Sequence, residues 1–300
     1  KFEHRGRIHA DINPIKSDQG GTVTGRFSYS NPNLQQIPAR NKDLGPMIRG
    51  LFIPEKDHSW GCFDYSQQEP RLVVHYAATT EPICFDESVS TIVEKFKSNS
   101  VDFHQTVADM AGISRSQAKT INLGLFYGMG KAKLQAELGL STKAEAENLF
   151  NQYHNNVPFV RELMNRTSAH AQTSGSIGTL LGRKCRFDKW EPNTFGMHTP
   201  MTLEEAERTY TRGRIRRAFT YKALNKLIQG SAADMTKKAM LDLYQEGIIP
   251  HIQIHDELDI SVESEDQAKK IIEIMENAVT LAVPNKVDYE SGETWGDIFG

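Results

Sequence analysis

Residues 252–262, with the sequence IQIHDELDISV, place one acidic residue inside a pattern that otherwise specifies a buried strand. If the segment is read as one extended piece, apolar residues fall at every second position, at Ile252, Ile254, Leu258, Ile260 and Val262. This alternation is typical of a strand that buries one face. Asp256 is in phase with these residues, where an unpaired carboxylate costs roughly several kcal/mol. The segment therefore predicts a core strand in which Asp256 has a functional task.

A second acid repeats this anomaly in the segment WGCFDYSQQE, residues 60–69. Asp64 follows an apolar, strand-like approach and precedes a polar turn. Two buried carboxylates from distant segments repel each other unless they share a proton or a cation, and hard divalent cations favour oxygen ligands. Two such ions about 3.5–4 Å apart form the clamp used in phosphoryl and nucleotidyl transfer. From spacing alone, the ordinary alternative stays open, in which each aspartate caps a helix or closes a turn.

A basic helical face is predicted in the segment RSQAKTINLGLFYG, residues 115–128. Arg115 and Lys119 are four residues apart and share one face of a helix, with Asn122 and Phe126 close to the same line. Such a face suits a nucleotide, because arginine and lysine hold phosphate oxygens and the aromatic end can meet a base. The alternative is a solvated face, but the positions between the cations are uncharged and the following INLGLFYG is too apolar for an exposed strip. His104 is ambiguous on its own.

The composition is that of a globular protein, with 38% hydrophobic and 24% charged residues among 300. Because the formal net charge is −3, any basic surface must be local. Cys62, Cys84 and Cys185 are far apart and include no CxxC pair, so they predict neither a zinc site nor a disulfide framework. No apolar run approaches the 18 residues of a membrane span, and no membrane segment is predicted.

The order of the predicted elements is mixed α and β. Extended pieces concentrate near both ends of the chain, so a sheet built from both ends would leave the helical middle as an inserted subdomain. We predict helices over 100–127, 141–172 and about 219–246, and a hairpin over 178–187. Residues 188–217 fit no clean period and contain a basic cluster.

Together, three segments resemble motifs A, B and C of family A DNA polymerases, the bacterial DNA polymerase I type: DYSQQEPRLVVHYA (64–77), RSQAKTINLGLFYGMG (115–130) and QIHDELDIS (253–261). Four more segments agree in order, TGRFSYSNPNLQQIPAR (24–40), DFHQTVA (102–108), ALNKLIQGSAADMTKKAM (223–240) and GETW (292–295). The resemblance covers essentially the whole chain. DYSQQEPR in place of the commoner DYSQIELR favours a bacteriophage or prophage member.

The resemblance implies an α+β fold, the right-hand polymerase arrangement of an antiparallel palm sheet with packed helices and mostly helical fingers. Residues 1–75 and 216–300 would form the palm, and residues 76–215 the fingers. The thumb and any exonuclease domain would be absent or lie before Lys1, or an accessory subunit would replace them. The resemblance also implies that the His-Asp-Glu of motif C sits in the tight turn of a hairpin, so the single strand predicted from the pattern is too simple.

The resemblance further implies a role for each matching position. Asp64 and Asp256 would bind two Mg²⁺ ions with the Tyr65 carbonyl, and Glu257 would be an auxiliary acid. Lys119 would act as a catalytic acid toward pyrophosphate and also bind the nucleotide. The other nucleotide contacts would be Gln67, Glu69, His104, Arg115, Leu123 and Tyr127. The DNA contacts would be Thr24, Arg26, Asn33, Gln35, Arg40, Asn225, Gln229 and His255.

Three positions depart from the family pattern. Leu123 stands where Phe or Tyr usually governs discrimination against dideoxynucleotides, and Tyr221 stands where the bacterial enzymes usually have arginine. Residues 188–217 are longer than usual, and their arginines are candidate contacts to the DNA backbone or merely a solvated charge run: Arg208, Arg212, Arg214, Arg216 and Arg217.

The function implied is template-directed DNA synthesis, with primer-template DNA and dNTPs as partners, in the cytoplasm of a bacterium or phage-infected host and without a membrane. One alternative is a single-subunit RNA polymerase, against which Glu69 argues because the 2′-hydroxyl needs a small residue at that position. The other is a non-catalytic DNA-binding remnant, against which the intact acids and Arg115 with Lys119 argue.

Overall fold

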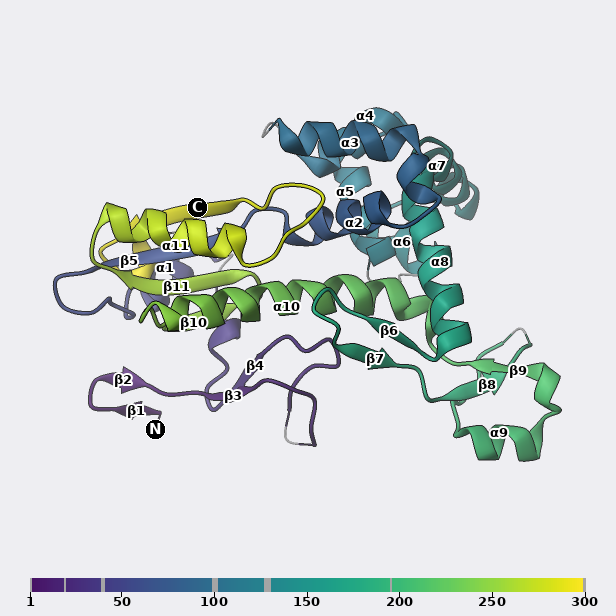
Figure 1. The fold of residues 1–300 in the computed structure, drawn as a ribbon, viewed down its shortest axis with the longest axis horizontal. Helices are drawn as coiled ribbons and strands as arrows, with labels where there is room; N and C mark the ends of the chain where they lie inside the picture. Colours follow the sequence, from purple (N-terminus) through teal and green to yellow (C-terminus); the bar gives the residue numbers. More distant parts are fainter. Residues whose placement is uncertain are drawn as a thin grey trace. The chain divides into compact units, whose positions relative to one another are not determined.

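The fold is given by a computed structural model that describes residues 2–18, 20–38, 41–98, 102–126, 131–194 and 196–298. For Phe85, Leu125, Phe126, Lys131, Ala132 and Arg212 it describes only the backbone. The chain divides into two compact units (Figure 1). Unit 1 comprises Lys1–Arg71 with Gln229–Gly300, and unit 2 comprises Leu72–Ile228. Both ends of the chain thus contribute to one unit and the middle forms the other.

Unit 1 is built on a four-stranded antiparallel sheet (Figure 1). Its order is β10 (Ile252–Ile254), β11 (Glu257–Val262), β5 (Ser59–Tyr65) and β12 (Val287–Gly292). The register pairs Asp64 with Glu257 on one side and with Asp288 on the other. Strands from distant parts of the sequence therefore place their acids side by side.

Both faces of this sheet are covered. On one face lies helix α11 (Glu265–Asn277), and the hydroxyl of Tyr65 donates to the Met275 carbonyl at 2.6 Å. On the other face Trp60, Ile252 and Trp295 form a buried cluster. Residues on both faces are therefore withdrawn from water: β5 is buried from Trp60 to Phe63, and β11 is buried from Leu258 to Ile260, the acid Asp259 included.

The segment that opens the sequence analysis is a hairpin and not a continuous strand. Ile254 pairs with Glu257 across a two-residue turn in which His255 adopts φ +55°. Such a turn sets its two flanking residues, Ile254 and Glu257, on the same face of the sheet. The apolar residues that alternate before the turn therefore lie on one face, and those that alternate after it lie on the other. Ile252 lies in the cluster with Trp60, whereas Leu258 pairs with Phe63 on the face toward α11. The single strand predicted from the pattern is wrong, and the hairpin implied by the resemblance is confirmed.

Unit 1 also contains short elements that precede or flank the sheet. They are β1 (Glu3–His4), β2 (Arg7–Ile8), β3 (Asp11–Asn13), β4 (Ser28–Ser30), η1 (Leu34–Gln36), α1 (Leu44–Arg49) and η5 (Trp295–Asp297). The pairs β1–β2 and β3–β4 form two-stranded antiparallel ribbons.

Unit 2 is mostly helical (Figure 1). It contains η2 (Ile83–Phe85), α3 (Glu87–Lys97), α4 (Phe103–Ala111), α5 (Arg115–Phe126), α6 (Lys131–Glu137), α7 (Lys143–Asn156), α8 (Pro158–Ser174), α9 (Leu203–Thr209), η3 (Arg212–Arg214) and η4 (Thr220–Lys222). Its strands form two ribbons, β6 (Ser176–Gly178) with β7 (Lys184–Arg186) and β8 (Trp190–Pro192) with β9 (Ile215–Arg217). Helices α2 (Gln68–Thr79) and α10 (Ala223–Gln245) cross the boundary between the units.

Two of the predicted helices are divided. The helix predicted over 100–127 is α4 and α5, because Gly112 ends α4 in the left-handed conformation, φ +65°. The helix predicted over 141–172 is α7 and α8, because Pro158 cannot continue a helix and instead begins the next one. The hairpin over 178–187 and the helix near 219–246 are confirmed as β6–β7 and α10.

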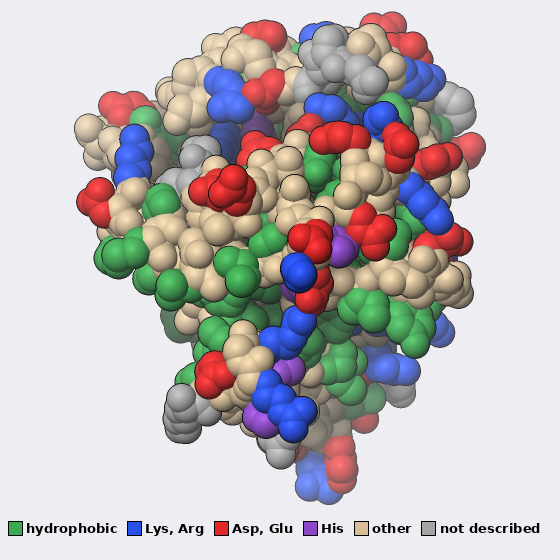
Figure 2. All heavy atoms as spheres, turned by 90° about the vertical axis from the view of Figure 1, so that its left-hand side faces the viewer, with side chains coloured by type: hydrophobic (Ala, Val, Ile, Leu, Met, Phe, Trp, Pro, Cys, Tyr) green, Lys and Arg blue, Asp and Glu red, His purple; other side chains and the backbone are tan. Residues whose placement is uncertain are grey.

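The predicted α+β class is confirmed by the antiparallel sheet of unit 1 and the helices of unit 2. On the face drawn in Figure 2, acidic and basic side chains are interspersed, as the small net charge suggests. Among the described residues, no helix combines the length and apolar character that crossing a membrane requires.

Candidate active site

Carboxylates gather at the hairpin end of the unit 1 sheet. Asp64 is the second-last residue of β5, with Glu257 of β11 and Asp288 of β12 as its cross-strand partners. Asp256 lies in the adjoining turn, and its backbone carbonyl accepts a hydrogen bond from the Tyr65 amide at 3.3 Å. The two acids that the sequence singled out are thus brought to one place by strand pairing.

These acids repel one another. Burial raises the pKa of Asp64 to about 7, and the charges of Asp256 and Asp288 add to the effect. Burial also raises the pKa of Asp256, while the positive charge of Arg26 opposes the rise. Ionising both aspartates at neutral pH therefore costs free energy, which a bound cation would recover.

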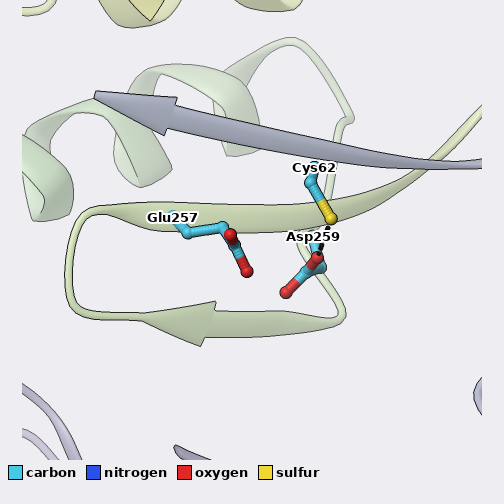
Figure 3. A group of neighbouring side chains, drawn as sticks. All are labelled: Cys62, Glu257 and Asp259. Carbon is cyan, nitrogen blue, oxygen red and sulfur yellow. Dashed lines mark hydrogen bonds between the residues drawn. The ribbon is translucent and has the colours of Figure 1, made fainter. Parts of the chain in front are cut away.

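A second group lies farther along the same sheet face (Figure 3). Asp259 is fully buried and accepts hydrogen bonds from the Trp60 indole at 3.0 Å and the Cys62 thiol at 2.8 Å. One potential ligand atom each of Cys62, Glu257 and Asp259 lie within 4.8 Å of one another. Burial raises the pKa of Glu257 to about 8 and of Asp259 to about 6.

Of these two groups, the Asp64–Asp256 pair is better suited to a hard divalent cation. Burial raises the pKa of Cys62 strongly, so its sulfur is a thiol that donates to Asp259 and not a thiolate ligand. Asp64 and Asp256 offer ionisable oxygens, which magnesium-type ions prefer. In the second group, Asp259 is a buried acid next to Glu257, and its carboxylate already accepts hydrogen bonds from the Trp60 indole and the Cys62 thiol.

Arg26 and Glu69 form an ion pair beside these acids. The Arg26 guanidinium donates to Glu69 Oε1 at 2.5 Å, and the two side chains are only 19% and 12% exposed. The charges of both reach Asp256, whose pKa Arg26 lowers and Glu69 raises. Arg26, a predicted DNA contact, and Glu69, the acid that argues against ribonucleotides, are therefore held together next to Asp256, a predicted metal ligand.

Glutamines hold the hairpin turn from behind. Gln35 Nε2 donates to the Gln253 carbonyl at 3.3 Å, and Gln253 Nε2 donates to the His255 carbonyl at 2.7 Å. Asn33 caps η1, accepting from the Gln35 amide at 3.1 Å. Gln253 thus holds the turn that carries Asp256, and Gln35 in turn holds the backbone of Gln253.

In unit 2, Asp102 organises the basic face that the sequence predicted. Its Oδ1 accepts from the Gln105 amide at 3.1 Å and caps α4, while its Oδ2 accepts from Arg115 Nε at 2.7 Å. Lys119 lies on α5, the helix of Arg115, and is exposed. One carboxylate thus joins the ends of α4 and α5 and orients Arg115.

His104 is oriented by a buried chain of hydrogen bonds. The Tyr153 hydroxyl donates to Asn122 Oδ1 at 2.5 Å, and Asn122 Nδ2 donates to His104 Nδ1 at 3.1 Å. Because Nδ1 accepts, the proton of the neutral ring is on Nε2. Burial lowers the pKa of His104, and Lys119 and Arg115 lower it further against the opposite effect of Asp102. The ring is therefore neutral near pH 7 and can donate through Nε2.

The predicted residues divide between the two units. Unit 1 contains Thr24, Arg26, Asn33, Gln35, Asp64, Tyr65, Gln67, Glu69, Gln229, His255, Asp256 and Glu257, and unit 2 contains His104, Arg115, Lys119, Leu123 and Asn225. Arg40 and Tyr127 lie outside the described residues.

Several residues beside these sites were not predicted. Asp259 alternates out of phase with the apolar residues and resembles a solvent-facing position, although Trp60 and Trp295 signal that its face is also covered. Tyr153 lies in a different helix from His104, and the sequence carries no signal that joins them. The roles of Asp259 and Tyr153 are therefore seen only in the hydrogen bonds of the folded chain.

The arginines of residues 188–217 are partly engaged within the chain. Arg208 pairs with Glu204 at 2.5 Å and Arg216 with Glu191 at 2.9 Å. The Arg217 guanidinium lies 4.6 Å from the Trp190 ring centre. Glu204 and Glu191 therefore offset part of the positive charge of the segment, and the neutral Trp190 ring packs against Arg217.

Known proteins resemble this chain over almost its whole length. The model of DNA polymerase family A matches residues 2–297. The DNA-directed DNA polymerase of Pseudomonas phage M6 is 34% identical over 98% of this chain and 48% of that protein. DNA polymerase I of Caldicellulosiruptor bescii is 36% identical over 97% of this chain and 32% of that protein.

A solved structure agrees. The polymerase domain of Pol1 from M. smegmatis, in complex with DNA primer-template and dNTP, superposes with a TM-score of 0.75 and 29% identity, over 98% of this chain and 49% of that one. The chain thus spans half or less of the length of these relatives. On the family match, which covers almost every residue, this chain belongs to DNA polymerase family A.

Proposed function

We propose that the chain catalyses template-directed DNA synthesis, adding dNTPs to the 3′-hydroxyl of a primer. The observation that carries the proposal is the meeting of Asp64 and Asp256 at one end of the sheet, where their charges repel. Membership of DNA polymerase family A supports the same reaction. The mutual repulsion is the expected state of a site whose cation is part of its function.

The cofactor we propose is a pair of Mg²⁺ ions held by Asp64, Asp256 and the Tyr65 carbonyl. The oxygen-only donor set fits a hard divalent cation, and such ions would supply charge neutralisation at the phosphates and activation of the primer hydroxyl. Glu257, whose pKa burial raises to about 8, would act as an auxiliary acid beside them.

The triphosphate would be held by unit 2. Arg115, oriented by Asp102, presents its guanidinium, and His104, oriented by Asn122, presents Nε2–H. Lys119 adds a point charge and would give a proton to the departing pyrophosphate. We further propose that Gln67, Leu123 and Tyr127 contact the nucleotide.

Glu69 would exclude ribonucleotides. Its carboxylate is fixed by Arg26 and is therefore placed by the chain before any nucleotide binds. A carboxylate at the sugar 2′-position crowds and repels a hydroxyl, which separates this chain from an RNA polymerase.

The DNA contacts we propose are Thr24, Arg26, Asn33, Gln35, Arg40, Asn225, Gln229 and His255. Residues 1–75 and 216–300 would be the palm and residues 76–215 the fingers, and a thumb, exonuclease region or accessory subunit would complete the holding of DNA. The proposed place of action is the cytoplasm of a bacterium or phage-infected host.

Primer extension with Mg²⁺ and dNTPs tests the proposal, comparing the chain with Asp256→Asn. We expect extension to fall by about 10³-fold or more, because a metal ligand and a charge are both lost. Asp266→Asn is the matched control, since that acid is on the surface with a side chain 93% exposed. Equal extension by the chain and Asp256→Asn would refute the metal assignment. Primer-template binding without extension by either protein would instead support a non-catalytic DNA-binding remnant.

A further inference from the structure

A thiol and two carboxylates meet on one face of the unit 1 sheet, and only one of them, Glu257, has a place in the proposed reaction. Glu257 and Asp259 are two residues apart on β11 and therefore point to the same face. The register sets Cys62 of β5 directly opposite Asp259. One potential ligand atom from each of the three lies within 4.8 Å of the other two (Figure 3). Strand alternation and strand pairing thus bring the three side chains together.

Asp259 has one satisfied and one unsatisfied oxygen. Its side chain is fully buried, and Oδ1 accepts from the Trp60 indole at 3.0 Å and from the Cys62 thiol at 2.8 Å. Oδ2 is also buried, accepts no hydrogen bond from the residues that the structure describes, and points toward the Glu257 carboxylate (Figure 3). A buried carboxylate oxygen without a donor costs free energy. A cation between Asp259 and Glu257 would remove that cost.

The positive charge near the two acids does not balance them. Burial raises the pKa of Glu257 and of Asp259, and the charge of Arg49 acts in the opposite direction on both. The Arg49 guanidinium lies 4.3 Å from the centre of the Trp295 ring. One guanidinium carries a single charge, and Asp64 adds a further negative charge beside Glu257. The group therefore attracts a cation.

The mixture of donor atoms selects the class of cation. Zn²⁺ binds cysteine sulfur together with carboxylate oxygen, whereas Mg²⁺ prefers oxygen alone. In the metal-free fold, Cys62 keeps its proton and donates it to Asp259. A thiophilic ion displaces such a proton when it binds. Glu257 is only partly buried, so an ion has a path from the solvent to the group.

We propose that Cys62, Glu257 and Asp259 bind one thiophilic divalent cation of the Zn²⁺ class, at a site separate from the proposed Mg²⁺ pair. On binding, the S–H bond of Cys62 breaks, its proton passes to the solvent, and the sulfur gives an electron pair to the cation. Asp259 and Glu257 supply the oxygen ligands, while the Trp60 indole continues to hold Oδ1 of Asp259. The inference goes beyond the proposed function and does not depend on it.

Titration with Co²⁺, a coloured substitute for Zn²⁺, tests this site under reducing conditions, in excess Mg²⁺ and without DNA or dNTPs. The unmodified chain should gain a sulfur-to-cobalt charge-transfer absorption that saturates at one Co²⁺ per chain. Zn²⁺ should abolish it, because Zn²⁺ binds such ligands more tightly than Co²⁺. Cys62→Ser should show no such absorption. Glu257→Gln, at a partly exposed position, should keep the absorption but weaken Co²⁺ binding by about 10-fold or more.

Matched controls are Cys84→Ser and Cys185→Ser, which remove the other two thiols, and Asp256→Asn, which removes a proposed Mg²⁺ ligand. All three should keep the absorption. In thermal unfolding, Zn²⁺ should raise the unfolding temperature of the unmodified chain more than that of Cys62→Ser, and the metal-free curve of each variant reports whether it is folded.

Three results overturn the proposal. The first is an unmodified chain without the absorption, which would show that the Cys62 proton is not displaced. The second is an absorption that persists in Cys62→Ser or is lost in Cys84→Ser or Cys185→Ser, which would indicate adventitious binding at another thiol. The third is an unchanged Co²⁺ affinity in Glu257→Gln, or a loss of the absorption in Asp256→Asn, which would show that no separate site exists. Because none of these measurements needs catalysis, failure here leaves the proposal of DNA synthesis untouched.

Discussion

The acids at the hairpin end of the sheet and the basic groups on α4 and α5 differ in how their charges are satisfied. In unit 1, Asp64 and Asp256 raise each other's cost of ionisation, and burial adds to it. In unit 2, Arg115 already has the Asp102 carboxylate, and His104 already has Asn122. The carboxylates of unit 1 thus repel one another, whereas the basic groups of unit 2 are already oriented by hydrogen bonds from their own chain.

This difference follows from what each site would bind. A cation site must place oxygen ligands close together before the cation arrives, and their repulsion is relieved only by binding. An anion site can orient its donors against groups of its own chain and still offer further N–H bonds, because arginine has five donors. The first arrangement costs stability in the absence of a ligand, whereas the second stabilises the fold.

The largest effect should come from Asp64→Asn. We expect primer extension to fall by about 10³-fold or more, because a metal ligand is lost. In contrast, the metal-free protein should become more stable at pH 8, by about 1 to 2 kcal/mol, because one repelling charge is removed. Thermal unfolding in EDTA, with Asp266→Asn as control, measures the second effect. A variant that loses both activity and stability would show that Asp64 has a structural role instead.

The same repulsion predicts how stability depends on pH. The pKa of Asp64 is raised to about 7 in the fold, so between about pH 4 and pH 7 the unfolded chain is ionised while the folded one keeps its proton. The destabilisation is therefore fully present above pH 7 and is lost as the pH falls toward 4. Asp64→Asn should flatten this part of the stability profile, and Mg²⁺ should stabilise the unmodified chain at pH 8.

The sequence was sufficient where local pattern and chemistry coincide. Asp256 and Asp64 stand out as acids in apolar segments, and Arg115 with Lys119 stands out from helical spacing alone. The sequence failed where the answer depends on a turn: the apolar residues before and after His255 and Asp256 keep the same alternation along the sequence, although the chain reverses there. Gly112 likewise ends a helix within a pattern that remains helical on both sides.

The supporting residues could not be predicted because their partners are remote in sequence. Asp259 accepts a hydrogen bond from Trp60, 199 residues away, and Tyr153 donates to Asn122, 31 residues away. Neither spacing corresponds to a helical or strand period. Such contacts arise only once tertiary packing has brought the elements together, so residues that orient a site are harder to find than residues that act in it.

A smaller effect should follow from Asp102→Asn. The amide oxygen can still cap α4, but the charge that orients Arg115 is lost. We expect KM for dNTPs to rise about 3- to 10-fold with kcat nearly unchanged, because ground-state binding is what weakens. Asp109→Asn, another exposed acid of α4 that accepts from Gln105, is the control. A fall in kcat with unchanged KM would place Asp102 in the chemical step instead.

Glu69→Ala tests a group that unit 1 holds in place before the nucleotide binds. Removing the carboxylate should raise ribonucleotide incorporation by about 10-fold, because crowding at the 2′-position is relieved. Competition between rNTPs and dNTPs in single-nucleotide extension measures the ratio. Arg26→Ala should shift it in the same direction but less, since Glu69 remains and is only released from its ion pair. Unchanged selectivity between rNTPs and dNTPs in Glu69→Ala would show that Glu69 does not exclude ribonucleotides.

The smallest effect on activity should come from Tyr153→Phe, and it separates orientation from stability in unit 2. The change removes the hydroxyl that donates to Asn122 Oδ1 and leaves that oxygen, in a fully buried side chain, without this donor. We expect a loss of about 1 to 3 kcal/mol in the free energy of unfolding. KM for dNTPs should rise only about 2- to 5-fold, because Asn122 still bonds His104 but is held less firmly. Tyr244→Phe, at an exposed position, is the control. If stability falls and KM does not move, the chain from Tyr153 to His104 supports the fold of unit 2 without orienting the histidine, and the orienting role assigned to the basic site would belong to Asp102 alone.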